Sequence, residues 1–145
     1  LGGEALTRVS IFLSVFDVHI NRSPCAASID VVAYRPGKFL NAAADKASDE
    51  NERMALALRR PDGRVIGCVQ IAGWVARRIV CYAKPGQAVV AGERFGHIRF
   101  GSRTDLYLPH GARLLVAPGQ RMIGGETVMA ELDPVAAGPR LAIEF

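Results

Sequence analysis

The sequence predicts a mainly β fold: a compact β-barrel or barrel-sandwich-like domain with an internal duplicated β-unit and one or two short helices. The 145 residues include 15 Gly and 8 Pro, which is typical of many tight turns between short elements. Runs rich in β-branched and aromatic residues lie between those turns, and one turn pattern occurs twice in the last third. Half of the residues are hydrophobic and 22% are charged, so we expect one core and a single domain over residues 1–145.

The N-terminal part predicts strands. The run from Val9 to Ile20 is β-branched and aromatic, and it predicts one long strand or two strands broken near Ser14. A second run from Ala27 to Tyr34 predicts another strand, in which Asp30 interrupts the apolar residues. Turn-forming residues follow each run, so the chain is expected to reverse direction after both.

The middle of the chain predicts a β-hairpin. Met54–Leu58 and Val65–Ile71 flank Pro61-Asp62-Gly63, which is a strong turn signal. Before the hairpin, residues 39–53 are polar and rich in alanine, and they fit a surface loop or a short helix. After it, residues 74–82 fit either a strand or a short helix, because Gly73 permits both.

The last third contains an internal repeat. Pro85-Gly86-Gln87 is followed by Gly92-Glu93, and Pro118-Gly119-Gln120 is followed at the same spacing by Gly125-Glu126, an offset of 118 − 85 = 33 residues. Two copies predict a duplicated β-unit inside one domain, since a solenoid needs three or more. The pattern resembles the barrel-sandwich hammerhead of biotinyl and lipoyl carrier domains. Those carriers present a lysine between their halves, whereas this chain has no lysine after Lys84.

Composition and charge exclude several classes of protein. The net charge is +4, but the arginines stand singly or in pairs instead of forming a basic stripe, so nucleic acid is not expected as a partner. The three cysteines lack CxxC spacing, which predicts neither a zinc site nor a disulfide framework and favours a reducing compartment. No uncharged apolar stretch of about 18 residues occurs. The start at Leu-Gly-Gly-Glu leads us to expect an upstream segment, which would carry any membrane anchor.

His19 and Ser102 are the candidate catalytic residues. Strand alternation places Asp17 and His19 on one face, which makes His19 a candidate base with an orienting carboxylate; the alternative is a hydrogen-bonded histidine at a strand end. His97 and His110 are expected at the surface, and no metal site is expected. Ser102 follows Gly101 at a tight break between two predicted strands, and a structural turn is the alternative there.

Several stretches resemble the phosphatidylserine decarboxylase family in its short bacterial and archaeal form. They are FDVHINRSP around His19, Asn51-Glu52-Arg53, Ile71-Ala72-Gly73 with Arg77-Arg78-Ile79-Val80, and above all AGERFGHIRFGSRTDLYLP from Ala91 to Pro109. The resemblance runs from about Val9 to Leu132. It implies that the Gly101-Ser102 peptide breaks itself and leaves a covalent pyruvoyl cofactor where Ser102 stood. The N-terminal β chain would then be residues 1–101 and the C-terminal α chain residues 102–145.

The resemblance also implies roles and partners. His19 would be the base for cleavage and the proton donor in decarboxylation, with an aspartate from an upstream segment, for which Asp17 is a geometric substitute. The pyruvoyl group would act as pyridoxal phosphate does in other decarboxylases. The implied reaction converts phosphatidylserine to phosphatidylethanolamine, or acts on a related lipid such as archaetidylserine. The enzyme would be a carboxy-lyase, peripheral on the cytoplasmic side of the cell membrane.

Two further expectations complete the hypothesis. The cleaved chains are expected to stay associated. The sequence leaves the oligomeric state undecided, and a homo-oligomer is one of the alternatives. The alternative function is a non-catalytic barrel-sandwich binding module, to which the 33-residue repeat alone points. The two hypotheses differ at residue 102, because a carrier keeps an intact serine and the enzyme must lose it.

Overall fold

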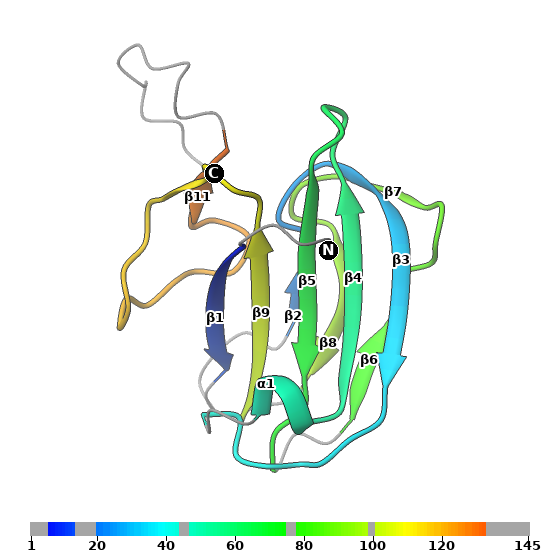
Figure 1. Ribbon diagram of the computed structural model, residues 1–145, viewed down its shortest axis with the longest axis vertical. Helices are drawn as coiled ribbons and strands as arrows, with labels where there is room; N and C mark the ends of the chain where they lie inside the picture. Colours follow the sequence, from blue (N-terminus) through cyan, green and yellow to red (C-terminus); the bar gives the residue numbers. More distant parts are fainter. Residues whose placement is uncertain (1–5, 14–19, 44–46, 75–77, 99–100, 133–145) are drawn as a thin grey trace.

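The computed structural model describes residues 6–13, 20–43, 47–74, 78–98 and 101–132, and the regular elements among them are strands apart from one short helix (Figure 1). The prediction of a mainly β fold is confirmed. In chain order the elements are β1 (Thr7–Leu13), β2 (Ile20–Arg22), β3 (Ala27–Arg35), α1 (Ala47–Glu50), β4 (Arg53–Arg59), β5 (Val65–Ile71), β6 (Ile79–Cys81), β7 (Ala88–Val89), β8 (Arg94–Ile98), β9 (Ser102–Leu108), β10 (Arg113–Leu114) and β11 (Ala130–Glu131).

Six strands form one antiparallel sheet in the order β1-β9-β5-β4-β3-β7. The predicted hairpin is its β4–β5 pair, in which Arg53 lies opposite Ile71 and Arg59 opposite Val65. The register of β3 against β4 shifts between Ile29 and Val31, at the aspartate that interrupts the apolar run. The bulge gives this polar residue a place outside the core, where its carboxylate accepts a hydrogen bond from Arg59 Nε at 2.7 Å.

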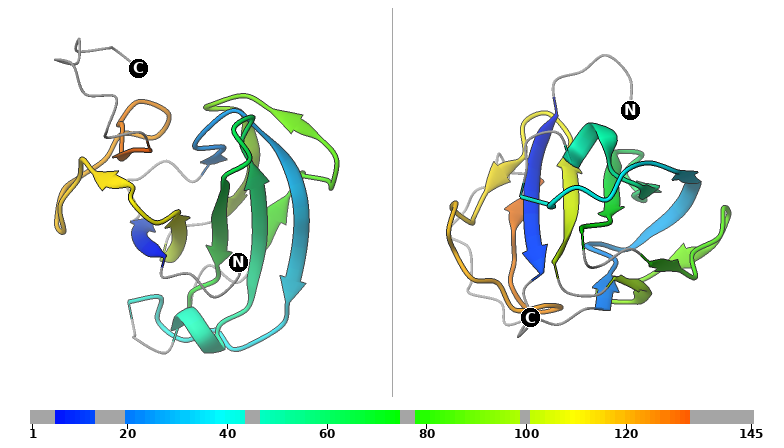
Figure 2. Two further views of the ribbon diagram at one scale, coloured as in Figure 1. Left: turned by 45° about the horizontal axis from the view of Figure 1, so that its top comes forward. Right: turned by 90° about the horizontal axis from the view of Figure 1, so that it is seen from below.

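The core lies between this sheet and a three-stranded sheet of order β2-β8-β6 (Figures 1 and 2). Buried side chains of β3, β4, β5 and β9 pack there against Phe95 of β8; they include Ile29, Leu56, Leu58, Cys68, Leu106 and Leu108. The small β10–β11 pair forms a third sheet. The arrangement is sandwich-like, and among the described strands no sheet closes into a barrel.

The internal repeat is visible as two matching pairs of turns. In each copy the glutamine closes the first turn twice, because its N–H donates to a carbonyl three residues earlier and its Oε1 accepts from the same residue, all at 3.1 Å (Lys84 with Gln87, Ala117 with Gln120). The glycines have φ of 85° and 84° in the first turn and 83° and 78° in the second (Gly86 and Gly119, Gly92 and Gly125). Positive φ explains why glycine occupies all four positions.

The ambiguous segments are settled in part. The run from Val9 to Ile20 contributes to two strands, β1 and β2, and its residues 14–19 lie outside the described residues. The described part of residues 39–53, which leaves out 44–46, contains the one-turn helix α1 and, at Arg53, the start of β4. The described part of residues 74–82 contains the strand β6. β9 begins at Ser102, directly after the expected break at Gly101, because Ser102 pairs with β1 and Arg103 pairs with β5.

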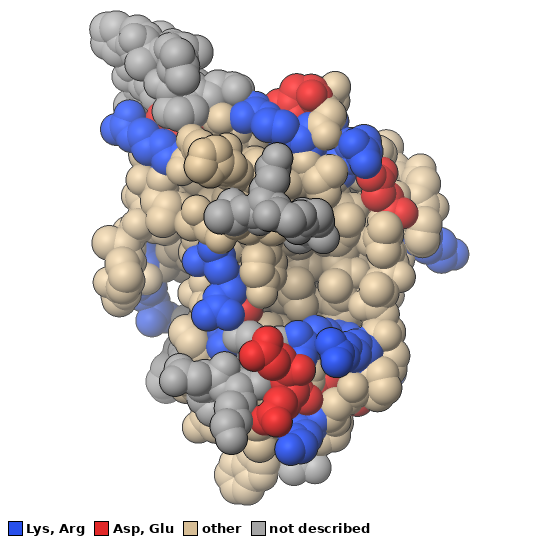
Figure 3. All heavy atoms as spheres, in the orientation of Figure 1, with Lys and Arg blue, Asp and Glu red and all other residues tan. Residues whose placement is uncertain are grey.

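Charged side chains are spread over the surface. On the face seen in Figure 3 the basic residues lie in separate groups, several of them beside acidic ones. Exposed ion pairs of the described residues include Arg59–Asp30 at 2.7 Å and Arg64–Asp62 at 2.7 Å. Such exposed pairs contribute little to stability.

The three cysteines differ in burial, which generates a prediction. Burial raises the pKa of the Cys68 thiol to about 12, and it raises the pKa values of the half-buried Cys25 and Cys81 less strongly. Because the thiolate is the reactive form, about one in 10⁴ Cys68 thiols is ionised at pH 8. We expect iodoacetamide to modify Cys68 last in the folded protein, as followed by peptide mass spectrometry. Equal modification of Cys68 and Cys25 in the folded state would contradict this, and equal rates in denaturant are the control.

Candidate functional site

Ser102 is held at the start of a strand that is paired on both edges. β9 pairs with β1, where Leu13 lies opposite Ser102, and with β5, where Ile71 lies opposite Arg103. Only 1% of Ser102 is exposed. The serine is therefore held by its own pairing with β1 and by the pairing of the next residue with β5, and it is removed from bulk water.

Gly101 gives the peptide before Ser102 a special backbone conformation. Its φ is +79°, which favours glycine because a Cβ is disfavoured in this region. Its N–H donates a 2.7 Å hydrogen bond to the carbonyl of Leu13. Gly101 is exposed while Ser102 is buried, so the peptide that joins them lies at the boundary between solvent and core.

Gly73 lies against that same peptide. A Cβ built on Gly73 would stand 1.8 Å from the carbonyl oxygen of Gly101, 2.9 Å from its carbonyl carbon and 3.5 Å from the nitrogen of Ser102. Neighbouring hydrogen bonds hold the segment before Gly73 in place, since Ala72 N–H donates to Glu52 at 3.0 Å and Ala72 carbonyl accepts from Asn51 Nδ2 at 2.8 Å. Only a residue without a side chain fits here.

Buried polar side chains line the face of the sheet to which Ser102 belongs. Alternation along β9 places Ser102 and Thr104 on the same face. Thr104 Oγ1 accepts from Asn21 Nδ2 at 3.0 Å, and Asn21 Oδ1 accepts from Gln70 Nε2 at 2.8 Å. Asn21 and Gln70 are 6% and 0% exposed. This polar cluster connects β2, β5 and β9 at the end of the core nearest to Ser102.

The next residue, Arg103, points to the opposite face and has a structural partner. Its Nε lies 2.9 Å from Asp105 Oδ1, and its Nη2 donates to Asp105 Oδ2 at 3.0 Å. Its Nη1 donates to the carbonyl of Ala42 at 3.0 Å, and the guanidinium lies 5.8 Å from the centre of the Phe12 ring. Both charged side chains are buried, so Arg103 anchors the start of β9 to the segment that covers it.

Comparison with known proteins assigns the chain to a family. A family model described as phosphatidylserine decarboxylase matches residues 2–130. The chain belongs to the phosphatidylserine decarboxylase family. The resemblance that the sequence motifs indicated is confirmed, and the Gly101-Ser102 peptide lies within the matched residues.

Curated relatives carry the name phosphatidylserine decarboxylase proenzyme. The protein of Granulibacter bethesdensis is 61% identical over 134 residues, which are 92% of this chain and 55% of the relative. That of Cereibacter sphaeroides is 60% identical over 137 residues, 94% of this chain and 59% of the relative, and that of Gluconobacter oxydans is 61% identical over 132 residues, 91% and 59% respectively. The chain thus spans somewhat more than half the length of these relatives. No solved structure matches it.

The structure of this phosphatidylserine decarboxylase family member describes some of the candidate residues and leaves others out. Gly101 and Ser102 are described, whereas His19 and Asp17 lie outside the described residues. His97 lies in β8, half-buried, with its Nδ1 2.9 Å from the hydroxyl of Tyr82, and His110 is exposed as expected. The relatives' names do not favour the non-catalytic binding module.

Sequence reasoning missed four residues of the site. Gly73, Asn21 and Thr104 lie in stretches that carry the family resemblance, but none was given a role in the site, and Gln70 was not singled out. Gln70 gave a local signal, since it is a polar residue inside the apolar run of β5. Within the described residues no group of three or more His, Cys, Asp or Glu side chains could hold a metal ion. The same residues contain no helix of the length and apolar character needed to cross a membrane.

The buried Arg103–Asp105 pair generates a stability prediction. Asp105→Ala leaves the buried Arg103 without its carboxylate, and breaking such a pair costs about 3–5 kcal/mol. The matched control is Asp30→Ala, which breaks the exposed pair with Arg59 and is expected to cost about 0–1 kcal/mol. Urea denaturation of the two variants and of the unaltered protein gives the free energy of unfolding from which both losses are obtained. A loss for Asp105→Ala no larger than for Asp30→Ala would contradict the anchoring role of Arg103.

Proposed function

We propose that this chain is the part of a phosphatidylserine decarboxylase that matures by cutting itself between Gly101 and Ser102. The observation that carries the proposal is the local structure of this peptide: a glycine with φ of +79°, a serine 1% exposed, and a strand fixed on both edges. Family membership adds the chemistry. The relatives' name, proenzyme, supports maturation by processing.

The residues present fit the formation of a pyruvoyl group from Ser102. In the first step the Ser102 Oγ attacks the Gly101 carbonyl carbon, the C–N bond breaks, and the hydroxyl proton ends on the new amine, which gives an ester. Loss of the Cα proton then breaks the Cβ–O bond and releases the Gly101 carboxylate. One water adds and one ammonia leaves. The exposed position of Gly101 supports this scheme, because the new carboxylate forms next to solvent.

The pyruvoyl group would supply an electrophilic carbonyl that draws electrons from the serine head group of the lipid. The chain's own residues would bind the lipid head group, exclude water from the site and deliver the proton that replaces the lost carboxylate. We assign the base and the later proton donor to His19, which directly precedes β2 in the sequence. The hydrogen bond from Asn21 to Thr104 supports this assignment, because it ties the start of β2 to β9 two residues from Ser102.

The substrate is then a serine phospholipid, with phosphatidylserine as the lipid that the relatives' name gives and archaetidylserine as a related one. We propose attachment to the cytoplasmic face of the membrane as a peripheral protein. Arg103 is not the residue that holds the lipid phosphate, because its donors face Asp105 and the carbonyl of Ala42.

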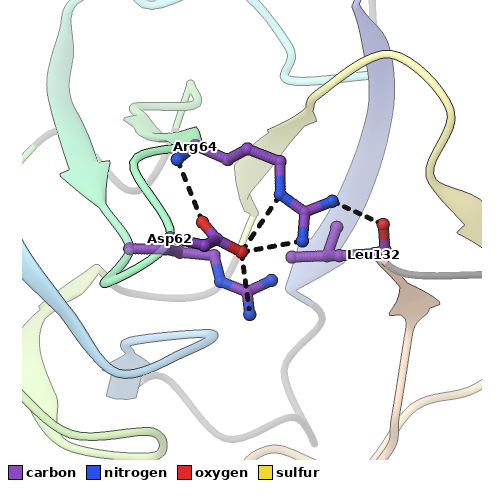
Figure 4. Close-up of polar contacts among 4 residues, drawn as sticks. Asp62, Arg64 and Leu132 are labelled. Atoms are coloured by element: carbon purple, nitrogen blue, oxygen red, sulfur yellow. Dashed lines mark hydrogen bonds and ion pairs between the residues drawn. The ribbon is translucent and has the colours of Figure 1, made fainter. Parts of the chain in front are cut away.

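The cleaved chains would remain associated. Residues 102–145 contribute β9, whose two neighbours β1 and β5 belong to residues 1–101. A second contact joins the two parts away from β9: Arg64 Nη1 donates to the carbonyl of Leu132, while Arg64 Nη2 donates to Asp62 at 2.7 Å (Figure 4). These contacts survive the loss of one peptide bond.

Intact mass spectrometry of the complete gene product tests the cleavage. We expect two denatured fragments that meet at Gly101, the C-terminal one lighter by one ammonia than the same fragment beginning with serine. Under native conditions the two should appear as one particle. Ser102→Ala should give a single uncleaved mass and no conversion of phosphatidylserine to phosphatidylethanolamine in vesicles. One full-length mass for the unaltered protein would overturn the proposal.

A comparison of two histidines tests the base. His19→Gln removes the proposed proton acceptor, so cleavage should slow by about 10²- to 10⁴-fold. His97→Gln is the matched control, since it removes a histidine whose partner is Tyr82, and it should cleave at the normal rate. The measurement is the fraction of uncleaved chain against time after synthesis. Normal cleavage of His19→Gln would remove His19 from the mechanism.

A further inference from the structure

We propose that Gly73 is a positioning residue for the self-cleavage, because its missing side chain provides the space in which the Gly101 carbonyl lies. This inference rests on the proposed function. The acting step is the attack of Ser102 Oγ on the Gly101 carbonyl carbon, in which the Oγ–C bond forms, the C–N bond breaks and the hydroxyl proton ends on the Ser102 nitrogen. Gly73 does not react; it sets where the carbonyl stands.

The space at Gly73 is occupied by the reacting group itself. A Cβ at this position would lie 1.8 Å from the Gly101 oxygen, whereas such contacts essentially never fall below 3.0 Å. Any side chain would therefore move the carbonyl, or Gly73, by at least 3.0 − 1.8 = 1.2 Å. The nearest atoms after the oxygen are the carbonyl carbon at 2.9 Å and the Ser102 nitrogen at 3.5 Å, the two atoms of the bond that must break.

Backbone conformation does not explain this glycine. Gly101 has positive φ, in common with the turn glycines such as Gly63 and Gly86, but Gly73 does not. An L-residue could adopt the backbone of Gly73 without strain of that kind. Glycine is required at position 73 only because a Cβ would occupy the space in which the Gly101 carbonyl lies.

Neither side of the contact can yield freely. The carbonyl of Ala72 is fixed by Asn51, whose Nδ2 donates at 2.8 Å and which is itself 1% exposed. On the other side, Gly101 N–H is bonded to the Leu13 carbonyl at 2.7 Å, and β9 is paired on both edges. The peptide between Gly101 and Ser102 is the part of this arrangement that a new methyl group would displace.

Displacement of the carbonyl matters because the attack depends on the angle and distance between Ser102 Oγ and the Gly101 carbon. Misplacement by about 1 Å is expected to slow a positioned reaction by about 10²-fold. The effect should appear before the ester forms. An ester is cut by hydroxylamine, so a variant arrested before the acyl shift gives no hydroxylamine-sensitive chain.

The test compares Gly73→Ala with Gly37→Ala in the complete gene product. Gly37 is the control for indirect effects, because its Cβ would meet the Glu50 carbonyl oxygen at 2.3 Å and the Asn51 carbon and Glu52 nitrogen at 2.9 Å. This clash falls on the segment that holds Ala72 and places no atom against the Gly101-Ser102 peptide. We expect Gly73→Ala to cleave about 10²-fold more slowly than the unaltered protein, without a hydroxylamine-sensitive fraction. Gly37→Ala should cleave within about threefold of the normal rate. Heat unfolding of both, each with Ser102→Ala to prevent cleavage, measures the damage to the fold.

Each outcome decides whether Gly73 positions the carbonyl or only supports the fold. A cooperative unfolding transition for both variants, with slow cleavage for Gly73→Ala alone, supports the proposal. Normal cleavage of Gly73→Ala overturns it, as does accumulation of the ester or slowing of both variants in parallel with their loss of thermal stability. Absence of a cooperative transition in Gly73→Ala assigns the glycine to folding and also overturns it. An uncleaved unaltered protein instead overturns the proposed function and, with it, this inference.

Discussion

The pairing of β9 on both edges is the constraint on which the site depends. A strand between two neighbours has its backbone donors and acceptors engaged, which applies to β9 from Arg103 onward, while its first residue, Ser102, is paired with Leu13 of β1. This arrangement lets a small residue such as Ser102 be both buried and fixed. It also means that the part of the chain after Gly101 belongs to the sheet through hydrogen bonds rather than through the peptide bond that precedes it.

The two faces of β9 serve different purposes because side chains alternate along a strand. Ser102 and Thr104 face the cluster with Asn21 and Gln70, whereas Arg103 and Asp105 form a buried ion pair on the other side. Burying two charges is costly unless their geometry is good, and here two contacts at 2.9 and 3.0 Å join them. The arginine in the Gly-Ser-Arg-Thr stretch therefore supports the strand, and its charge lies on the face opposite to the serine.

Local chemistry made most strands and turns predictable, whereas the site required long-range contacts. The hairpin around Pro61-Asp62-Gly63 and the two Pro-Gly-Gln turns were predicted because turn residues act within four positions. The sequence does not show that β1 pairs with β9, which joins residues 102 − 13 = 89 to 108 − 7 = 101 positions apart. It likewise hides the approach of Gly73 to Gly101, since a glycine selected for room has no local pattern around it.

The two glycines at the site therefore meet different physical demands on one peptide bond. Gly101 adopts a backbone conformation that a side chain disfavours. Gly73 has no Cβ, and this leaves space for the Gly101 carbonyl to lie against its backbone. Either demand alone is common in turns and in close packing. Together they place a carbonyl in left-handed backbone conformation directly against another backbone, with a buried hydroxyl-bearing residue next in the chain. The proposed self-cleavage would need this kind of confinement, because its nucleophile and electrophile are already joined in the chain and only their orientation can be controlled.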